Sequence, residues 1–221
     1  NLSDETLSRV ILALVDHPML QGLSLNRNEG LDQTTRALCF LFDSDSCMLS
    51  ELFFGAQSSP PRKINVGPLA EAIVRYGFIQ LLDLSDNRLD NHDLVTLLDA
   101  ASRCRTLVSL NLGDNDIGNL NLLGGIMQTH NPSRLRTLYL GGNPLGDDDR
   151  EALAKLVEDH PVLHVFGFRS PHSRRLLTPD IQYMLDLNRS GRALLTNPST
   201  PLSVWAKVLE IANRSSVRKR D

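Results

Sequence analysis

The stretch Ile79-Gln80-Leu81-Leu82-Asp83-Leu84-Ser85-Asp86-Asn87 carries apolar residues at its first, fourth and sixth positions and ends on asparagine. The same pattern returns without a gap at Leu107–Asn115 and again at Leu135–Asn143. Three further copies place the starts at residues 20, 49, 79, 107, 135 and 163, which are spaced by 29, 30, 28, 28 and 28 residues. Self-similarity at such a period predicts an array of stacked structural repeats.

Two of the six copies depart from the pattern. The second copy ends on Gln57 in place of asparagine and precedes residues 58–63, where serines and prolines predict a protruding loop. In the last copy the same frame assigns the three apolar positions to Leu163, Phe166 and Phe168. We therefore expect six units of unequal regularity.

The recurring Leu-x-Leu predicts a short strand with one apolar face, because side chains alternate between the two faces of a strand. The asparagine after it has two donor hydrogens and an acceptor oxygen, so it can satisfy backbone groups where the chain leaves the strand. Burying an asparagine is otherwise costly, which makes its recurrence informative. We expect a structural ladder that links neighbouring coils through Asn28, Asn87, Asn115 and Asn143.

Between the strands lie runs with apolar residues at helical spacing and acidic residues at the start, such as Asp149–Val157. Each unit is thus predicted to contain a strand, a turn, a helix and a segment that leads back to the next strand. This pattern resembles the leucine-rich-repeat family, and the 28-residue unit with a full helix resembles its ribonuclease-inhibitor-like subclass. The resemblance implies an α/β solenoid: a right-handed horseshoe of about six repeats, with strands on the concave side and helices on the convex side.

We assign residues 1–171 to the repeats and residues 172–221 to a small helical C-terminal cap with a basic tail. A helix predicted over Thr6–Val15 would belong to a unit before the first visible strand, so we expect the array to continue upstream of residue 1. In the cap, one predicted helix carries a single apolar stripe formed by Leu202, Trp205, Val208 and Leu209.

Composition limits the function classes. A chain of 221 residues with 41% hydrophobic content can bury a core without metals or disulfides. The formal net charge of -3 offers no broad basic field, so no nucleic-acid partner is expected. No apolar run approaches the roughly 20 residues that span a bilayer, so no membrane partner is expected. The odd set Cys39, Cys47 and Cys104 lies within or just after apolar helical runs, which favours a reducing, cytoplasmic location.

The residues between the core leucines are expected to form columns on the concave surface. The central column reads from Ser24 to Gly167, and a neighbouring column ends on Val165. Aromatic anchors and an acidic cluster that includes Asp83, Asp86, Asp114 and Asp116 favour a protein partner with a basic patch. The predicted partner-binding set is Phe53, Leu81, Asp83, Asn111, Asp114, Tyr139 and Arg169. The alternative is a partner that binds a loop or the convex side.

Signatures of catalysis and of cofactor binding are missing from the sequence: it contains neither a Gly-x-Ser-x-Gly elbow nor a phosphate-binding loop. His160 and His164 are four residues apart, but Pro161 interrupts helical spacing and no third metal ligand is apparent. We therefore expect a non-enzymatic scaffold or sensor segment without a cofactor. The oligomeric state is left open.

Two other functions remain open at this stage. A GTPase-activating regulator resembling the Ran GTPase activator would use the same repeat subclass, with Arg27 and Arg88 as candidate contact residues. A third hypothesis is that the protein is a substrate receptor of a ubiquitin ligase. This hypothesis depends only on the C-terminal stretch Leu187–Leu209.

Overall fold

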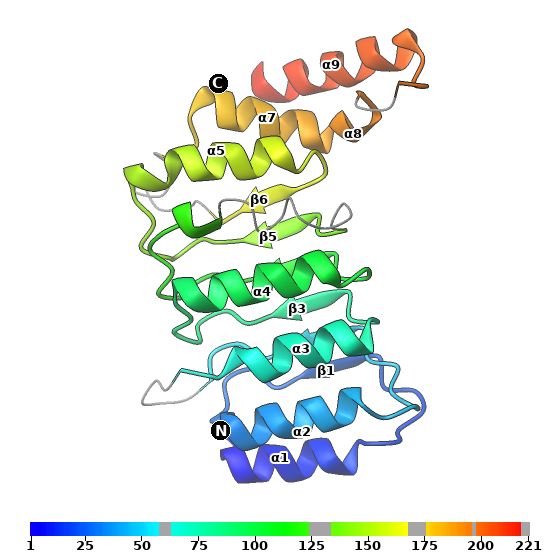
Figure 1. Ribbon diagram of the computed structural model, residues 1–221, viewed down its shortest axis with the longest axis vertical. Helices are drawn as coiled ribbons and strands as arrows, with labels where there is room; N and C mark the ends of the chain where they lie inside the picture. The colour runs from blue at the N-terminus through cyan, green and yellow to red at the C-terminus, as the bar shows by residue number, and fades with distance from the viewer. Residues whose placement is uncertain (58–62, 124–133, 168–175, 196–197, 218–221) are drawn as a thin grey trace.

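The fold is given by a computed structural model, which describes residues 1–57, 63–123, 134–167, 176–195 and 198–217. Its six short strands form one sheet in the order β1-β2-β3-β4-β5-β6, and every neighbouring pair is parallel. The chain therefore advances by one strand per repeat (Figure 1), as the period predicts. The strands are β1 (Gly22–Ser24), β2 (Glu51–Phe53), β3 (Leu81–Asp83), β4 (Ser109–Asn111), β5 (Thr137–Tyr139) and β6 (His164–Phe166).

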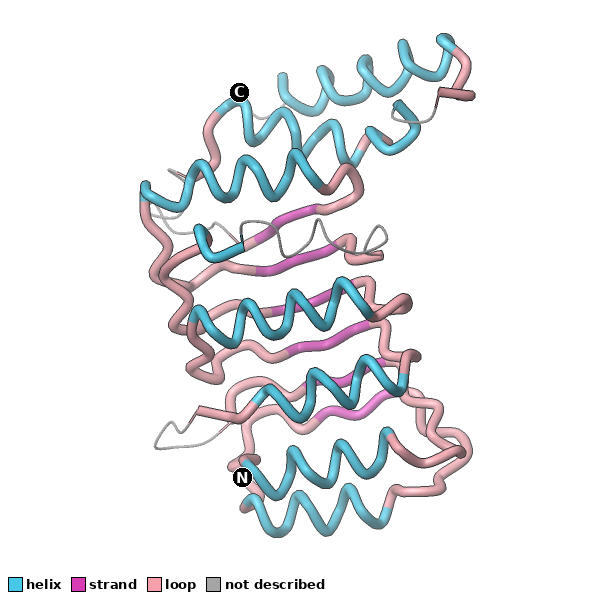
Figure 2. The backbone as a smooth tube through the Cα atoms, in the orientation of Figure 1, coloured by secondary structure: helices cyan, strands magenta, loops and turns pink. Residues whose placement is uncertain are grey.

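In the described part of the chain, the helices stack against one face of this sheet and none covers the opposite face (Figure 2). This arrangement confirms the predicted α/β solenoid. We call the open face the concave face. The helices of the repeats are α1 (Asp4–Ala13), α2 (Asp32–Phe42), α3 (Val66–Tyr76), α4 (Asn91–Arg103) and α5 (Arg150–Asp159), with short 3-10 turns η1 (Asn121–Leu123) and η3 (Asp147–Asp149).

The first helix begins earlier than Thr6, where the periodicity placed its start. Ser3 is the N-cap of α1, and its hydroxyl oxygen accepts a hydrogen bond from the backbone N–H of Thr6 (3.3 Å). A serine side chain satisfies an unpaired donor of the first turn, so the helix starts right after it. None of the helices in the described part of the chain is long and apolar enough to cross a lipid bilayer.

The core runs the length of the solenoid between the sheet and the helices. The central residue of each inner strand is almost fully buried: Leu52 is 0% exposed, Leu82 2%, Leu110 0% and Leu138 0%. These leucines form one continuous cluster with the inward faces of the helices. Removing apolar surface from water is the main stabilising effect in this arrangement, and stacked units provide the surface that one unit could not bury alone.

A row of buried amides lies where the strands end. The Oδ1 of Asn115 accepts hydrogen bonds from the backbone N–H groups of Asn87 (2.9 Å) and Leu89 (3.0 Å), and its Nδ2 donates to the carbonyl of Leu84 (3.1 Å). Asn143 repeats this geometry one coil later, since it accepts from Ile117 N–H at 3.0 Å. Each asparagine therefore binds the backbone of the coil that precedes it.

The irregular second unit keeps the same contacts with a longer side chain. Gln57 is 2% exposed; its Nε2 donates to the carbonyl of Leu25 (2.8 Å) and its Oε1 accepts from Gly30 N–H (3.0 Å). At the start of the ladder, the Oδ1 of the half-buried Asn28 accepts from Leu2 N–H at 2.8 Å. The loop predicted over residues 58–63 lies outside the described residues except for Lys63.

The register of the sixth strand differs from the prediction. His164, Val165 and Phe166 align with Thr137, Leu138 and Tyr139, so this unit is one residue shorter than the frame assumed. Val165 is 3% exposed and belongs to the core; its assignment to a concave column was wrong. A shift of one residue exchanges the two faces of a strand, which is why Val165 lies in the core instead of on the concave face.

The C-terminal helices attach to the array in sequence. Helix α7 (Pro179–Arg189) buries Ile181 and Leu185 in the main core, followed by α8 (Arg192–Leu195) and α9 (Leu202–Val217). Helix α9 packs on α7 through a small second cluster that contains Val208 and Ala212. The predicted single apolar stripe is therefore split: Val208 is 3% exposed, whereas Leu202 is 81%, Trp205 37% and Leu209 38% exposed.

Candidate protein-binding surface

Two columns of side chains flank the buried leucines on the concave face. One column contains Leu81 of β3, aligned with Glu51 and Ser109 on its neighbours, and the other contains Asp83, aligned with Phe53 and Asn111. Strand alternation places both columns on the face opposite the central leucines. Five predicted residues thus lie on this one surface, namely Phe53, Leu81, Asp83, Asn111 and Tyr139.

The two aromatic residues of this surface stand apart. Phe53 and Tyr139 occupy the same column, but Asp83 and Asn111 lie between them. Three spacings of neighbouring strands separate their backbones by about 14 Å. The Tyr139 side chain is 40% exposed, and Phe53 is half-buried. A partner would therefore have to meet them at two separate points.

Polar side chains between the aromatics are held by turns at the strand ends. The Oδ1 of Asp83 accepts hydrogen bonds from Ser85 N–H (2.9 Å) and from its hydroxyl (2.7 Å). The Oδ1 of Asn111 accepts from Gly113 N–H at 3.0 Å. These bonds fix the orientation of both side chains, so a partner that binds them loses less side-chain entropy.

A left-handed backbone position precedes each ladder amide, a feature that the leucine periodicity does not reveal. Asp86 has a φ of 54° and Asp114 a φ of 55°, and the equivalent residues Arg27, Ala56 and Gly142 have values of 60°, 52° and 79°. Aspartate tolerates this conformation better than most residues with a side chain. Two members of the acidic cluster therefore have a backbone role as well as an exposed carboxylate.

The position is tightly packed in the fifth coil. A Cβ atom added at Gly142 would overlap the carboxylate of Asp114, and one at Gly141 would overlap the backbone of Gly167. Glycine at 142 satisfies both the positive φ and the close approach. The side chain of Asp114 thus lies against Gly142 of the next coil, which restricts its orientation at the edge of the concave face.

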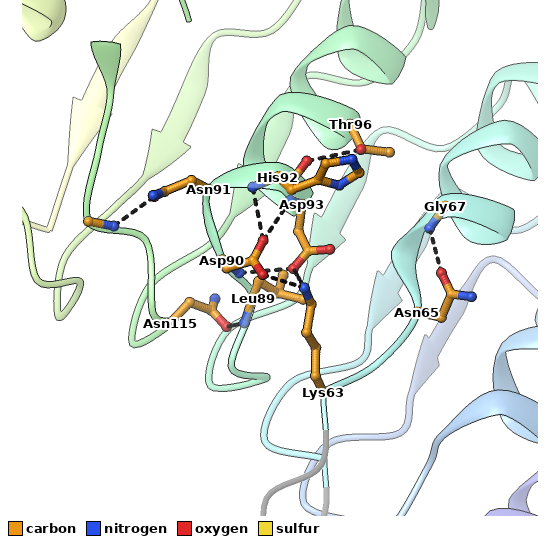
Figure 3. A network of polar contacts seen from close by, with 11 residues as sticks. Lys63, Asn65, Gly67, Leu89, Asp90, Asn91, His92, Asp93, Thr96 and Asn115 are labelled. Atoms are coloured by element: carbon orange, nitrogen blue, oxygen red, sulfur yellow. Dashed lines mark hydrogen bonds and ion pairs between the residues drawn. The ribbon is translucent and has the colours of Figure 1, made fainter. Parts of the chain in front are cut away.

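A second pair of acidic residues, Asp90 and Asp93, lies at the edge where α4 begins and shares one lysine (Figure 3). The Nζ of Lys63 lies 2.6 Å from Asp90 Oδ2 and 2.8 Å from Asp93 Oδ2. Asp90 also caps α4, because its Oδ1 accepts from the backbone N–H of His92 (2.9 Å). Lys63 holds the pKa of Asp90 down, to about 2. Asp90 and Asp93 therefore hold Lys63 and the first turn of α4 in place.

The remaining candidates do not form a site together. Arg27 precedes a ladder amide, whereas Arg88 follows one, so these exposed arginines belong to different rows of the repeat. Arg169 lies outside the described residues. His160 ends α5 and His164 lies in β6, and burial lowers the pKa of both. Within the described ranges, no three His, Cys, Asp or Glu side chains gather as a metal site.

Comparison with known proteins gives a family match and partial relatives. A family model described as Leucine Rich repeat matches residues 103–120 and 132–154. NACHT, LRR and PYD domains-containing protein 13 of Homo sapiens is 27% identical over 201 residues, which cover 88% of this chain and 18% of that protein. Preferentially expressed antigen in melanoma-like protein 7 of Mus musculus is 40% identical over 75 residues, 34% of this chain and 16% of that protein. The chain thus spans less than a fifth of either relative.

Among solved structures, Leiomodin-1 Actin-Binding Site 2 superposes with a TM-score of 0.50. The superposition covers 83% of this chain and 92% of that one at 17% identity. At this identity the likeness is one of fold alone.

Proposed function

We propose, from the premise that this chain is a leucine-rich-repeat protein, that it is a non-enzymatic module that binds a protein partner through its concave face. The carrying observation is the in-register column of Phe53, Asp83, Asn111 and Tyr139 on the face that the helices leave open. An exposed tyrosine in such a column is the type of residue that dominates binding energy at protein interfaces.

The partner would present a basic patch to the ends of β3 and β4. Asp86 and Asp114 are exposed there, one coil apart, next to the half-buried Asp83. No ion pair joins these three carboxylates to another residue in the described ranges, in contrast to Asp90 and Asp93, which bind Lys63. Complementary charge would accelerate association and select the partner.

We further place the protein in the cytoplasm and in the ribonuclease-inhibitor-like subclass. The thiols of Cys39, Cys47 and Cys104 are all free, and two of them are buried as small apolar groups, which fits a reducing compartment. Full helices such as α3 and α4 between successive strands support the subclass.

A capture experiment with matched variants tests the concave site. The chain is used as bait in cell extract, and the partner that it retains is compared for Tyr139→Ala with Asp83→Asn and for the control Phe40→Ala. Phe40 is a 60% exposed aromatic residue on α2, outside the sheet. We expect the concave double variant to lose at least about tenfold of the captured partner. Loss with Phe40→Ala and retention with the double variant would place the interface on the helical side.

A further inference from the structure

Helices α5 and α7 are joined near their C-terminal ends. At the joined end, Asn188 Nδ2 donates to the carbonyl of His160 (3.0 Å) and Arg192 donates to the carbonyl of Glu158 (2.9 Å). A groove of about 740 Å³ lies along the length of α5, from Asp147 to Glu158, and along the first half of α7, from Thr178 to Met184. This volume falls within the range of pockets that bind ligands.

The groove has an apolar floor and an acidic rim. Ala154 of α5 and Ile181 and Met184 of α7 supply the apolar side chains of the lining. Five carboxylates line the groove as well, from Asp147, Asp148, Glu151, Glu158 and Asp180. Arg150, the one cation among the described residues of the lining, is 2.8 Å from the carboxylate of Asp147. The lining therefore carries a strong excess of negative charge.

Helix stabilisation explains only part of this charge. Glu151 and Asp180 lie in the first turns of α5 and α7, where carboxylates interact favourably with the helix dipole. Glu158 lies in the last turn of α5, where a carboxylate opposes that dipole. At the start of α4, Lys63 forms ion pairs with both Asp90 and Asp93, whereas the described lining residues of the groove include no equivalent lysine.

We infer that this groove binds a basic amphipathic segment of a protein partner, as a second interface on the helical side of the solenoid. The aliphatic side chains of the segment would lie on the half-buried Ala154 and Met184, and its lysines or arginines would reach the carboxylates of the rim. Apolar grooves that accept one face of a helix are a common mode of peptide recognition. The opposite charges set the orientation of the segment and accelerate its association.

The experiment uses two fluorescent 16-residue peptides with leucines at helical spacing, one with lysines at all other positions and one with glutamates. Binding to the full chain is followed by fluorescence anisotropy. We expect the lysine peptide to bind, the glutamate peptide not to bind, and the affinity to fall as salt is raised. The charge variant is Glu151→Lys with Asp180→Lys, and the floor variant is Met184→Glu; each is expected to weaken binding about tenfold or more.

The control is Asp32→Lys, which reverses an exposed carboxylate in the first turn of α2, outside the groove. It changes the net charge and a helix N-terminus without touching the lining, so binding should stay within about twofold of the wild type. Thermal melting of every variant establishes that it is folded. Equal binding by the folded charge variant, or equal loss in the Asp32 control, would overturn the groove as the binding site. The Tyr139 variant should bind the peptide normally, so this test is independent of the concave site.

Discussion

The central coils and the C-terminal helices are built from similar elements but are held in different ways. A strand such as β4 has a paired neighbour on each side, a fully buried leucine, and an amide that bonds the preceding coil. Helix α9 rests on α7 through a small cluster whose buried members, among the described residues, are Leu187, Val208 and Ala212. In a solenoid each unit is stabilised by its nearest neighbours, so we expect stability to be high in the centre and low at this end.

The largest effect is expected at the centre of the sheet. Leu110→Ala removes a side chain that is 0% exposed and leaves a cavity between β4 and the helices. The free energy of unfolding should fall by about 3 kcal/mol, measured by urea denaturation. Leu122→Ala, at a position that is 50% exposed, serves as the control and should change it by less than about 0.5 kcal/mol. If Leu110→Ala lowers the free energy of unfolding only slightly, the central coils are not more stable than the C-terminal helices.

The second largest loss in the free energy of unfolding is expected in the row of buried amides that links neighbouring coils. Asn115→Ala leaves the N–H groups of Asn87 and Leu89 without their acceptor, and unsatisfied buried groups of this kind cost about 2 kcal/mol. Asn111→Ala removes a half-buried asparagine four residues earlier that accepts from Gly113, and should cost about 1 kcal/mol or less. Equal losses in the two variants would argue that the ladder has no special role.

A local effect is expected at the C-terminal end. Val208→Ala weakens the contact between α9 and α7 and should lower the local stability of α9 by about 1 kcal/mol. Hydrogen exchange should accelerate at the amides of α9 and remain unchanged in β3 and β4. Acceleration throughout the sheet would show that the two regions unfold as one unit.

The smallest effect concerns Lys63→Met. The folded-state pKa of Asp90, about 2, lies below its ordinary value of 3.8, so the ion pair stabilises the fold above about pH 4 and is lost as the pH falls through 2. Because both side chains are partly exposed, the change should stay below about 1 kcal/mol at neutral pH and vanish near pH 2. An NMR titration should show the pKa of Asp90 rising toward 3.8. An unchanged pKa would mean that Lys63 is not its cause.

Sequence periodicity predicted the repeat and the register of five strands, because leucine spacing and strand alternation follow directly from residue positions. It gave the wrong register at β6, because two alignments of this unit both put apolar residues in the core. The predicted alignment uses Leu163, Phe166 and Phe168, whereas the observed one uses Leu163 and Val165. Residue counting cannot choose between them, whereas packing against β5 does.

The candidate site was predictable only as columns of residues. Alternation put Phe53, Asp83 and Tyr139 on one face, but their separation depends on the strand pairing. The left-handed conformation of Asp86 and Asp114 had no obvious signal, because arginine and alanine occupy the same position in other coils. The groove between α5 and α7 depends on how two helices far apart in sequence pack together, which no local pattern encodes.

The glutamine at position 57 has a consequence for recognising related chains. Its side chain is one methylene longer than asparagine, yet it reaches the same backbone partners in a unit that is two residues longer than the 28-residue spacing. A search profile that demands asparagine at this rung would pass over such a unit and report a break in the array. Accepting either carboxamide, with a variable length after it, would recover divergent units that would otherwise be taken for loops.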